Sequence, residues 1–296
     1  RGAAEKILAR YLIERDDGPK TAAQPDQITV GEVLALYARR IAPNTADPIR
    51  IGYAIKALAP FWGGLTCNEV IGSNCQDYQN KRDVAPSTVR RELGVLQAAL
   101  NYAHKEGRLT LAAKVSLPPH GASRDRWLTR EEAAKLLREL RRTKCSRHVA
   151  RFLILGLYTG SRPGTVLNTT WNMRTDGPWV DLKTGIYHRK GADESITPKA
   201  RRPCLMPKLL VAHMKRWRRS YGGNYVVEYN GKPISDVGNA LDLACKRAKI
   251  PRITPHTVKH TAITWYFQAG GSVEDAADYF STTVETLLSV YRQHSP

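Results

Sequence analysis

The chain is 296 residues long, and its 42% hydrophobic and 25% charged residues are ordinary values for a globular protein, so wholesale disorder is excluded. Its 46 Lys and Arg residues against 27 Asp and Glu residues leave a formal net charge of +19, which favours a polyanion such as nucleic acid as the partner. No apolar run reaches the length of about 18 residues that a transmembrane span needs, and five scattered cysteines without Cys-x-x-Cys spacing favour neither a zinc site nor a disulfide framework.

The first part of the chain is expected to be a helix followed by a linker. Apolar residues at helical spacing predict a helix over residues 1–15, and a turn-rich stretch rich in Gly and Pro leads to residue 27. Residues 1–15 lack the apolar centre of a signal peptide. Because the sequence does not start with Met, we expect it to begin inside a longer protein.

Residues 28–119 predict a small all-helical domain. Apolar residues at helical spacing indicate four helices, which begin near Thr29, Ile49, Asn68 and Pro86. Ser87 or Thr88 would be the N-cap of the last helix. The residues that follow combine Pro, Gly and charge without periodicity, and therefore predict an interdomain linker over residues 120–127.

Residues 128–296 predict a second domain in which helices surround a short sheet. A capping box from Thr129 to Glu132 opens a helix that runs to about Arg142. Short alternating runs predict an antiparallel sheet near residues 179–182, 185–188 and 204–206. Helical spacing is found over residues 148–157, 208–221, 237–248, 257–269, 273–279 and 284–291. The expected fold class is therefore mostly α with a small antiparallel β-sheet (α+β).

Four segments of the second domain resemble one family when they are taken together. Arg162 follows Thr-Gly at the end of an apolar helix, Lys199 lies in a Lys-Ala-Arg-Arg-Pro segment, His256 begins a His-Thr-Val-Lys-His segment, and Tyr291 lies near the chain end. Their order and spacing resemble those of the tyrosine recombinase (phage integrase) family over residues 128–296. The resemblance implies an N-terminal helical core-binding domain followed by a tyrosine-recombinase catalytic domain.

The same resemblance implies a site-specific DNA recombinase or integrase that cuts and rejoins DNA through a 3′-phosphotyrosyl intermediate. Tyr291 would attack phosphorus, and Arg162 would donate two parallel hydrogen bonds to the phosphate. His256 would hold the phosphate or move a proton. Lys199 would protonate the departing 5′ oxygen, with Lys190 as its rival. No metal or cofactor is expected, and the element moved would be a mobile genetic element.

Two positions depart from the family pattern. Lys259 stands where a second arginine is expected, and a lysine ammonium group keeps the charge but loses the bidentate fork. Thr282, nine residues before Tyr291, stands where His or Trp is expected, and its hydroxyl group cannot carry a proton as imidazole does. Three explanations stay open: a slower or differently tuned enzyme, an introduced Lys259 that traps a complex, or a paralogue that binds DNA without cutting it.

Basic and polar residues of both domains are expected to contact a duplex, as in the family. Their binding should depend strongly on salt, because each phosphate contact releases counterions. The expected DNA-binding residues are Lys81, Arg82, Ser87, Thr88, Arg90, Arg91, Arg124, Arg126, Arg201 and Arg202.

The resemblance also implies partners and a cellular location. We expect double-stranded attachment or crossover sites, dimers and tetramers on DNA, an excisionase or a host bending protein as a further partner, no membrane, and a bacterial cytoplasmic, nucleoid-associated location. The alternatives are a catalytically weakened or inactive DNA-binding paralogue with an architectural or regulatory role, and a type IB topoisomerase with the same chemistry.

Overall fold

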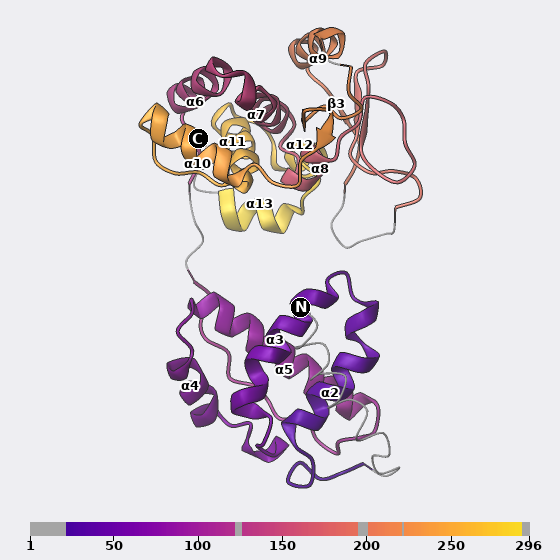
Figure 1. Ribbon diagram of the computed structural model, residues 1–296, viewed down its shortest axis with the longest axis vertical. Coiled ribbons are helices and arrows are strands. Elements are labelled where there is room, and N and C mark those ends of the chain that lie inside the picture. Colours follow the sequence, from indigo (N-terminus) through magenta and orange to yellow (C-terminus); the bar gives the residue numbers. More distant parts are fainter. Residues whose placement is uncertain (1–21, 122–125, 195–200, 221, 292–296) are drawn as a thin grey trace. The chain divides into compact units, whose positions relative to one another are not determined.

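The computed structural model describes residues 22–121, 126–194, 201–220 and 222–291, and for Tyr291 the backbone alone. The chain divides into two compact units, Arg1–Ser123 and Arg124–Pro296, which are described here one at a time (Figure 1). None of the described helices is long and apolar enough to cross a lipid bilayer.

The described part of the first unit is helical. A capping box between Thr29 and Glu32 starts its first described helix, and Asp47 caps the next one with its side chain. The elements are α2 (Val30–Arg40), η1 (Ala42–Asn44), α3 (Pro48–Trp62), η2 (Cys67–Glu69), α4 (Gly72–Lys81) and α5 (Pro86–Lys105). The longest of these, α5, packs against α2, α3 and α4, so its apolar face forms the middle of the core.

The core of the first unit contains one buried polar group of three side chains. The Glu92 carboxylate, 5% exposed, accepts hydrogen bonds from Tyr78 Oη at 2.7 Å and from two nitrogens of Arg82 at 3.1 and 2.7 Å. Burial favours the neutral form of Glu92, but the hydrogen bonds from Arg82 and Tyr78 outweigh it and lower the pKa of the carboxyl group. The cation and the anion of this group therefore neutralise one another inside the unit.

The second unit is built around the apolar helix α7 (Arg147–Thr159), which packs against α6 (Arg130–Arg142), α9 (Lys208–Ser220) and α11 (Pro255–Gln268). The predicted capping box of Thr129 and Glu132 begins α6. Figure 1 shows α6, α7, α10 (Gly238–Ala248) and α11 gathered together, with β3 and α9 on the other side. The remaining elements are η3 (Lys144–Ser146), α8 (Pro163–Leu167), α12 (Val273–Tyr279) and α13 (Val284–Tyr291).

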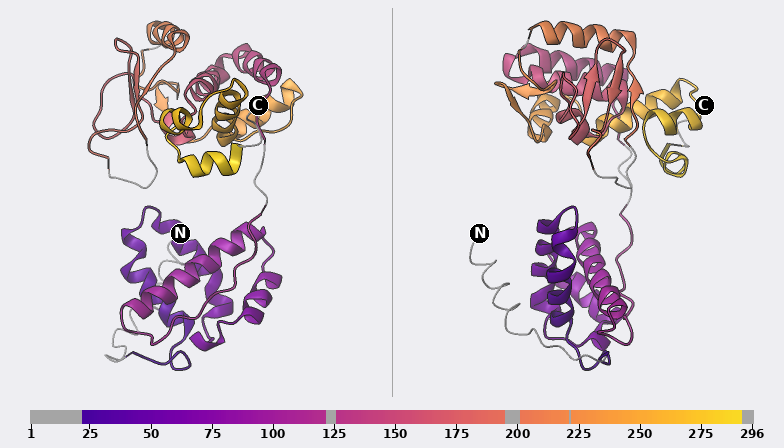
Figure 2. Two further views of the ribbon diagram at one scale, coloured as in Figure 1. Left: turned by 180° about the vertical axis from the view of Figure 1, so that it is seen from behind. Right: turned by 90° about the vertical axis from the view of Figure 1, so that its right-hand side faces the viewer.

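A three-stranded antiparallel sheet follows α8. Its strands β1 (Trp179–Asp181), β2 (Ile186–His188) and β3 (Cys204–Leu205) pair in that order, with Val180 opposite Tyr187 and Tyr187 opposite Cys204. A separate hairpin joins β4 (Glu228–Tyr229) to β5 (Lys232–Pro233). The last two helices, α12 and α13, pack together and against α11, as both views in Figure 2 also indicate.

The fold class predicted from the sequence, mostly α with a small antiparallel sheet, is confirmed. Two expectations were wrong in detail. The helix expected from Asn68 is split into η2 and α4, since Val70 and Ile71 leave the helical region between them. The N-cap of α5 is Ala85, with Pro86 at the first helical position, so that Ser87 and Thr88 lie in the first turn. The helix expected over residues 1–15 lies outside the described residues.

Candidate active site

Arg162 is placed by the way in which α7 ends. Gly160 closes the helix in the left-handed region (φ 57°), and a Cβ atom at this position would lie 2.3 Å from a ring carbon of Phe280. Both constraints require glycine here. The chain then turns out through Ser161, and Arg162 becomes the extended N-cap of α8, with Pro163 fixing the first helical position. The Thr-Gly-x-Arg spacing thus brings a half-buried guanidinium group to the end of an apolar helix.

His256 and Lys259 come from the first two turns of α11. Thr254 caps this helix in a box with Thr257, and Pro255 occupies its first position. His256 and Lys259 are three residues apart and therefore share one face. His256 is exposed, whereas Lys259 is mostly buried and its Nζ donates to the Phe280 carbonyl oxygen at 3.1 Å.

Lys259 lies in strongly cationic surroundings. Burial, and then the charges of Arg162 and Arg189, lower its pKa from 10.5 to about 7. Burial also lowers the pKa of Arg162, with further contributions from Arg201 and Arg189. The structure therefore brings two predicted site residues, Arg162 and Lys259, into one electrostatic cluster.

Thr282 and Tyr291 belong to the last part of the described chain. Ser281 has a left-handed backbone (φ 49°) and ends the turn after α12, and the half-buried Thr282 follows it. The backbone N–H of Thr282 donates to the Ala277 carbonyl oxygen at 3.1 Å. Tyr291 is the final residue of α13, and Leu287 packs this helix into the cluster formed with α11 and α12.

Of the two lysine candidates, Lys190 is among the described residues. Lys199 lies outside the described residues. Lys190 is described: it follows β2, is half-buried, and comes directly after the buried Arg189.

Arg189 is a site residue that sequence reasoning missed. It is only 2% exposed and its guanidinium group lies close enough to Arg162 and Lys259 to lower both of their pKa values. The signal that could have found it was the alternation itself. Side chains alternate between the two faces of a strand. Arg189 lies two residues after the buried Tyr187, so it is expected on the same buried face.

The expected DNA-binding residues of the first unit differ in their surroundings. Arg82 is held by Glu92, and the Arg90 guanidinium donates to the Pro118 carbonyl oxygen. Lys81 lies over the Phe61 ring, with Nζ 5.7 Å from its centroid. Arg91 and Ser87 are exposed, and the N–H of Thr88 donates to the Ala85 carbonyl oxygen at 2.8 Å.

In the second unit, three of the expected DNA-binding residues are paired with carboxylates. Arg126 forms two hydrogen bonds with Glu132 at 2.9 and 2.8 Å. Arg201 lies 2.6 Å from Glu194, and the exposed Arg202 contacts Asp278. Arg124 lies outside the described residues.

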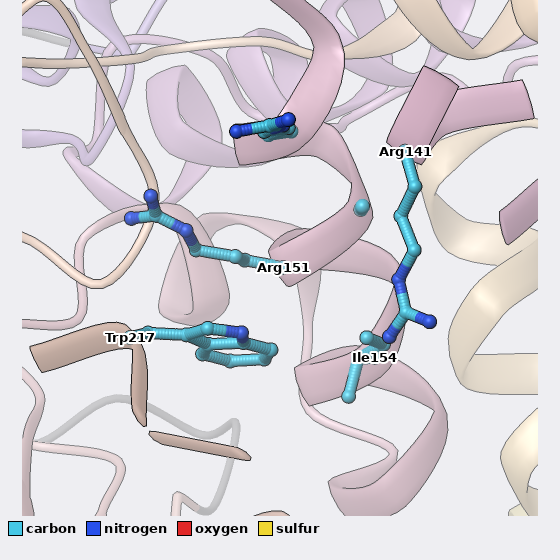
Figure 3. A pocket seen from close by; sticks show the side chains of 6 residues that line it. Arg141, Arg151, Ile154 and Trp217 are labelled. Atoms are coloured by element: carbon cyan, nitrogen blue, oxygen red, sulfur yellow. The ribbon is translucent and has the colours of Figure 1, made fainter. Parts of the chain in front are cut away.

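A second cationic hollow lies at the other end of α7. A cavity of about 280 Å³ is lined by Arg141 and five residues of α7 and α9, among them Arg151, Ile154 and Trp217 (Figure 3). At about 1.5 Å rise per residue, the length of α7 puts Arg147 about 18 Å from Thr159. None of the residues that line this hollow belongs to the cluster of Arg162, Arg189 and Lys259.

No protein-family model matches the chain. Among curated proteins it is similar to the shufflon-specific DNA recombinase of Escherichia coli, with 27% identity over 195 residues, which is 64% of this chain and 46% of the relative. It is also similar to the integrase of Salmonella phage P22, with 25% identity over 200 residues, 64% of this chain and 49% of the relative. The chain thus spans about half the length of the curated relatives it matches.

Solved structures match a larger part of the chain. The Tn1549 transposon integrase in complex with a circular intermediate DNA has a TM-score of 0.73 at 17% identity and covers 90% of this chain and 95% of its own. The lambda integrase bound to DNA has a TM-score of 0.66 at 18% identity and covers 90% and 96%. These matches show that the chain has the fold of the tyrosine recombinases, and the resemblance seen in the motifs is confirmed.

Proposed function

We propose that the protein is a site-specific DNA recombinase or integrase that cuts and rejoins DNA for the integration or excision of a mobile element. The observation that carries this proposal is the cluster of Arg162, Arg189 and Lys259, in which burial and the charges of the two arginines lower the pKa of Lys259. Cations held in a half-buried site need an anion, and a DNA phosphate supplies it.

The proposed reaction replaces the bond between phosphorus and the 5′ oxygen of the DNA by a bond between phosphorus and the Tyr291 oxygen. The Tyr291 oxygen attacks phosphorus, the bond to the 5′ oxygen breaks, and a 3′-phosphotyrosyl link retains the energy needed for rejoining. The tyrosine loses its proton and the departing 5′ oxygen gains one. Rejoining runs the same step in reverse, with the 5′ hydroxyl group of the exchanged strand as the nucleophile.

The cluster would act on the charge that grows on the non-bridging oxygens in the transition state. Arg162 donates a bidentate pair of hydrogen bonds, and Lys259 adds a second positive charge in its protonated form. His256, on the same face of α11 as Lys259, donates to the phosphate or moves a proton. Thr282 contributes a hydroxyl group. Lys199 remains our candidate for the general acid, and Lys190 its rival.

A duplex would be bound through the exposed or partly exposed cations of both units. Lys81 and Arg91 of the first unit are candidates that form no ion pair in the described structure. Arg126, Arg201 and Arg202 would have to exchange a carboxylate for a phosphate. The proposed partners are double-stranded attachment sites and further protomers, up to a tetramer on DNA, with an excisionase or a bending protein as a further partner. We propose that the protein acts on the bacterial nucleoid in the cytoplasm.

The test is a trapping experiment. A duplex is first enriched from a random-sequence pool by binding to the purified protein, and a nick is then placed near its centre so that a cleaved fragment diffuses away. A covalent protein–DNA band that survives detergent is expected. Binding without any such band at every nick position would instead identify a DNA-binding paralogue that no longer cuts. Relaxation of a supercoiled plasmid without sequence preference would identify a topoisomerase.

A further inference from the structure

Arg189 makes an unusual number of contacts for one side chain. Its Nη2 donates to the Thr159 carbonyl oxygen at 2.7 Å and its Nε to Ser161 Oγ at 2.8 Å. Its Nη1 lies 2.5 Å from the Tyr279 carbonyl oxygen, 3.3 Å from the Arg202 carbonyl oxygen and 3.3 Å from Ser281 Oγ. All five acceptors are carbonyl or hydroxyl groups.

Each acceptor lies next to a part of the candidate site. Ser161 immediately precedes Arg162, and Thr159 is the last residue of α7. Tyr279 and Ser281 flank Phe280, whose carbonyl oxygen accepts the hydrogen bond from Lys259, and Thr282 follows. One guanidinium group therefore joins the end of α7, the turn between α12 and α13, and the segment that leads into β3.

Among the residues that the structure describes, Arg189 forms no ion pair with a carboxylate. Tyr187, Cys204 and Tyr279 are its titratable neighbours, and burial raises the pKa of all three, which keeps them neutral at pH 7. Its charge also lowers the pKa values of two basic groups, Arg162 and Lys259. A buried positive charge without an internal counterion strengthens the attraction for an anion at the nearby surface.

We propose that Arg189 is a positioning residue of the active site: its buried guanidinium group holds the segments that carry Arg162 and Thr282 in one arrangement, and its charge adds to the positive field that receives the phosphate. The inference rests on the proposed function for its catalytic readout. Arginine is required because its planar fork directs five N–H groups to several acceptors at once, whereas lysine has three donors on a single nitrogen.

The first test compares two buried arginines of the same unit. Arg151 is 4% exposed and donates to the Val226 carbonyl oxygen at 3.1 Å, from a position on α7 remote from Arg162. Arg189→Lys and Arg151→Lys each remove one buried fork and should lower the melting temperature. Only Arg189→Lys should slow covalent adduct formation on the enriched nicked duplex, by about tenfold to a hundredfold, because small displacements of catalytic groups have effects of this size.

In the same comparison, the dissociation constant for the intact duplex should stay within a few-fold for both variants. Equal adduct rates in Arg189→Lys and Arg151→Lys, at equal loss of thermal stability, would overturn the positioning role. The expected split between rate and affinity would not follow from a general loss of folding, which lowers both together.

The second test needs no DNA. The side-chain resonance of Lys259, assigned by its loss in Lys259→Arg, is titrated by NMR in the wild-type protein and in Arg189→Gln. Removing the Arg189 charge should move the midpoint of the Lys259 titration to higher pH, while Arg189→Lys should leave it near the wild-type value. An unchanged midpoint in Arg189→Gln would contradict the proposed field. This outcome is independent of whether the protein cuts DNA, so failure of the proposed function and failure of this inference can be told apart.

Discussion

The two units differ in the partners of their buried charged side chains. In the first unit, the Arg82 guanidinium and the Glu92 carboxylate meet at 2.7 Å, and Tyr78 completes the group with a hydrogen bond to the same carboxylate. In the second unit, Arg162, Arg189 and Lys259 lie together, and the side-chain nitrogens of Arg189 and Lys259 donate to carbonyl and hydroxyl oxygens. In the first group a carboxylate faces the cation, whereas in the second group the basic side chains lower one another's pKa values.

This difference distinguishes a structural polar group from a functional one. A buried ion pair satisfies itself, and breaking it leaves an uncompensated charge. A cluster of basic side chains disfavours its own charged form, as the lowered pKa of Lys259 indicates, and is tolerated where a ligand supplies negative charge. The cluster therefore lowers the stability of the second unit at the place where the proposed chemistry needs positive charge.

The largest expected effect concerns Tyr291, the proposed nucleophile. Tyr291→Phe should abolish the covalent protein–DNA band and leave duplex affinity within a few-fold, because the phenol oxygen is lost while the cations remain. Tyr229→Phe, which alters an exposed tyrosine of β4, is the matched control and should leave the band unchanged. A band that survives in Tyr291→Phe would move the nucleophile to another residue.

The next largest effect tests whether the cationic cluster is suited to its proposed anion. Lys259→Arg should raise the cleavage rate between about tenfold and a thousandfold, from roughly 1–4 kcal/mol of added transition-state contact by a bidentate donor. The exposed Lys246→Arg on α10 should have no such effect. If the rate of Lys259→Arg is equal or lower, the pocket that directs Lys259 to the Phe280 carbonyl oxygen is built around lysine.

The neutral group of the first unit should respond in stability and not in activity. Glu92→Gln removes the anion that faces Arg82, and should lower the free energy of unfolding of the first unit by about 2–3 kcal/mol, the size of a hydrogen bond to a charged group. Hydrogen exchange of the α5 amides measures this loss. Glu131→Gln, which breaks an exposed pair with Lys135, should have little effect. A similar loss in both variants would show that the buried group of Glu92 stabilises the fold no more than the exposed pair of Glu131 and Lys135 does.

The last expected effects are changes of stability with pH, and they fall in different parts of the pH scale. Glu92 has a lowered pKa, so its contribution is present above its unfolded pKa and is lost as the pH falls through its folded pKa. Lys259 has a pKa of about 7 in the fold against 10.5 ordinarily. Between these values the unfolded chain binds the additional proton, so stability should rise with pH from 7 towards 10.

Urea denaturation of the wild-type protein and of Lys259→Met at pH 7, 8 and 9 measures the second effect. Methionine does not titrate, so the stability advantage of Lys259→Met over the wild type should shrink as the pH rises. A constant difference across this range would show that Lys259 keeps its ordinary pKa in the fold.

Local patterns in the sequence determined much of this protein. The capping box at Thr129 and Glu132 fixed the start of α6, and the helices expected over residues 273–279 and 284–291 have these same bounds in the structure. The order Arg162, His256, Tyr291 indicated the fold of the tyrosine recombinases. Such features depend on hydrogen bonds and side-chain spacing within a few turns of chain, so they can be predicted without knowledge of the tertiary structure.

The tertiary structure alone decided which charges are neutralised and which are not. Arg82 and Arg189 are both arginines that follow a secondary-structure element, yet one meets a glutamate ten residues away and the other meets carbonyl groups from as far as residue 279. The amino-acid composition of α5 or of β2 does not show which side of the element is buried. Burial and counterions depend on contacts between segments distant in sequence, because desolvation and Coulomb energy are properties of the folded surroundings of a charge and not of its neighbours along the chain.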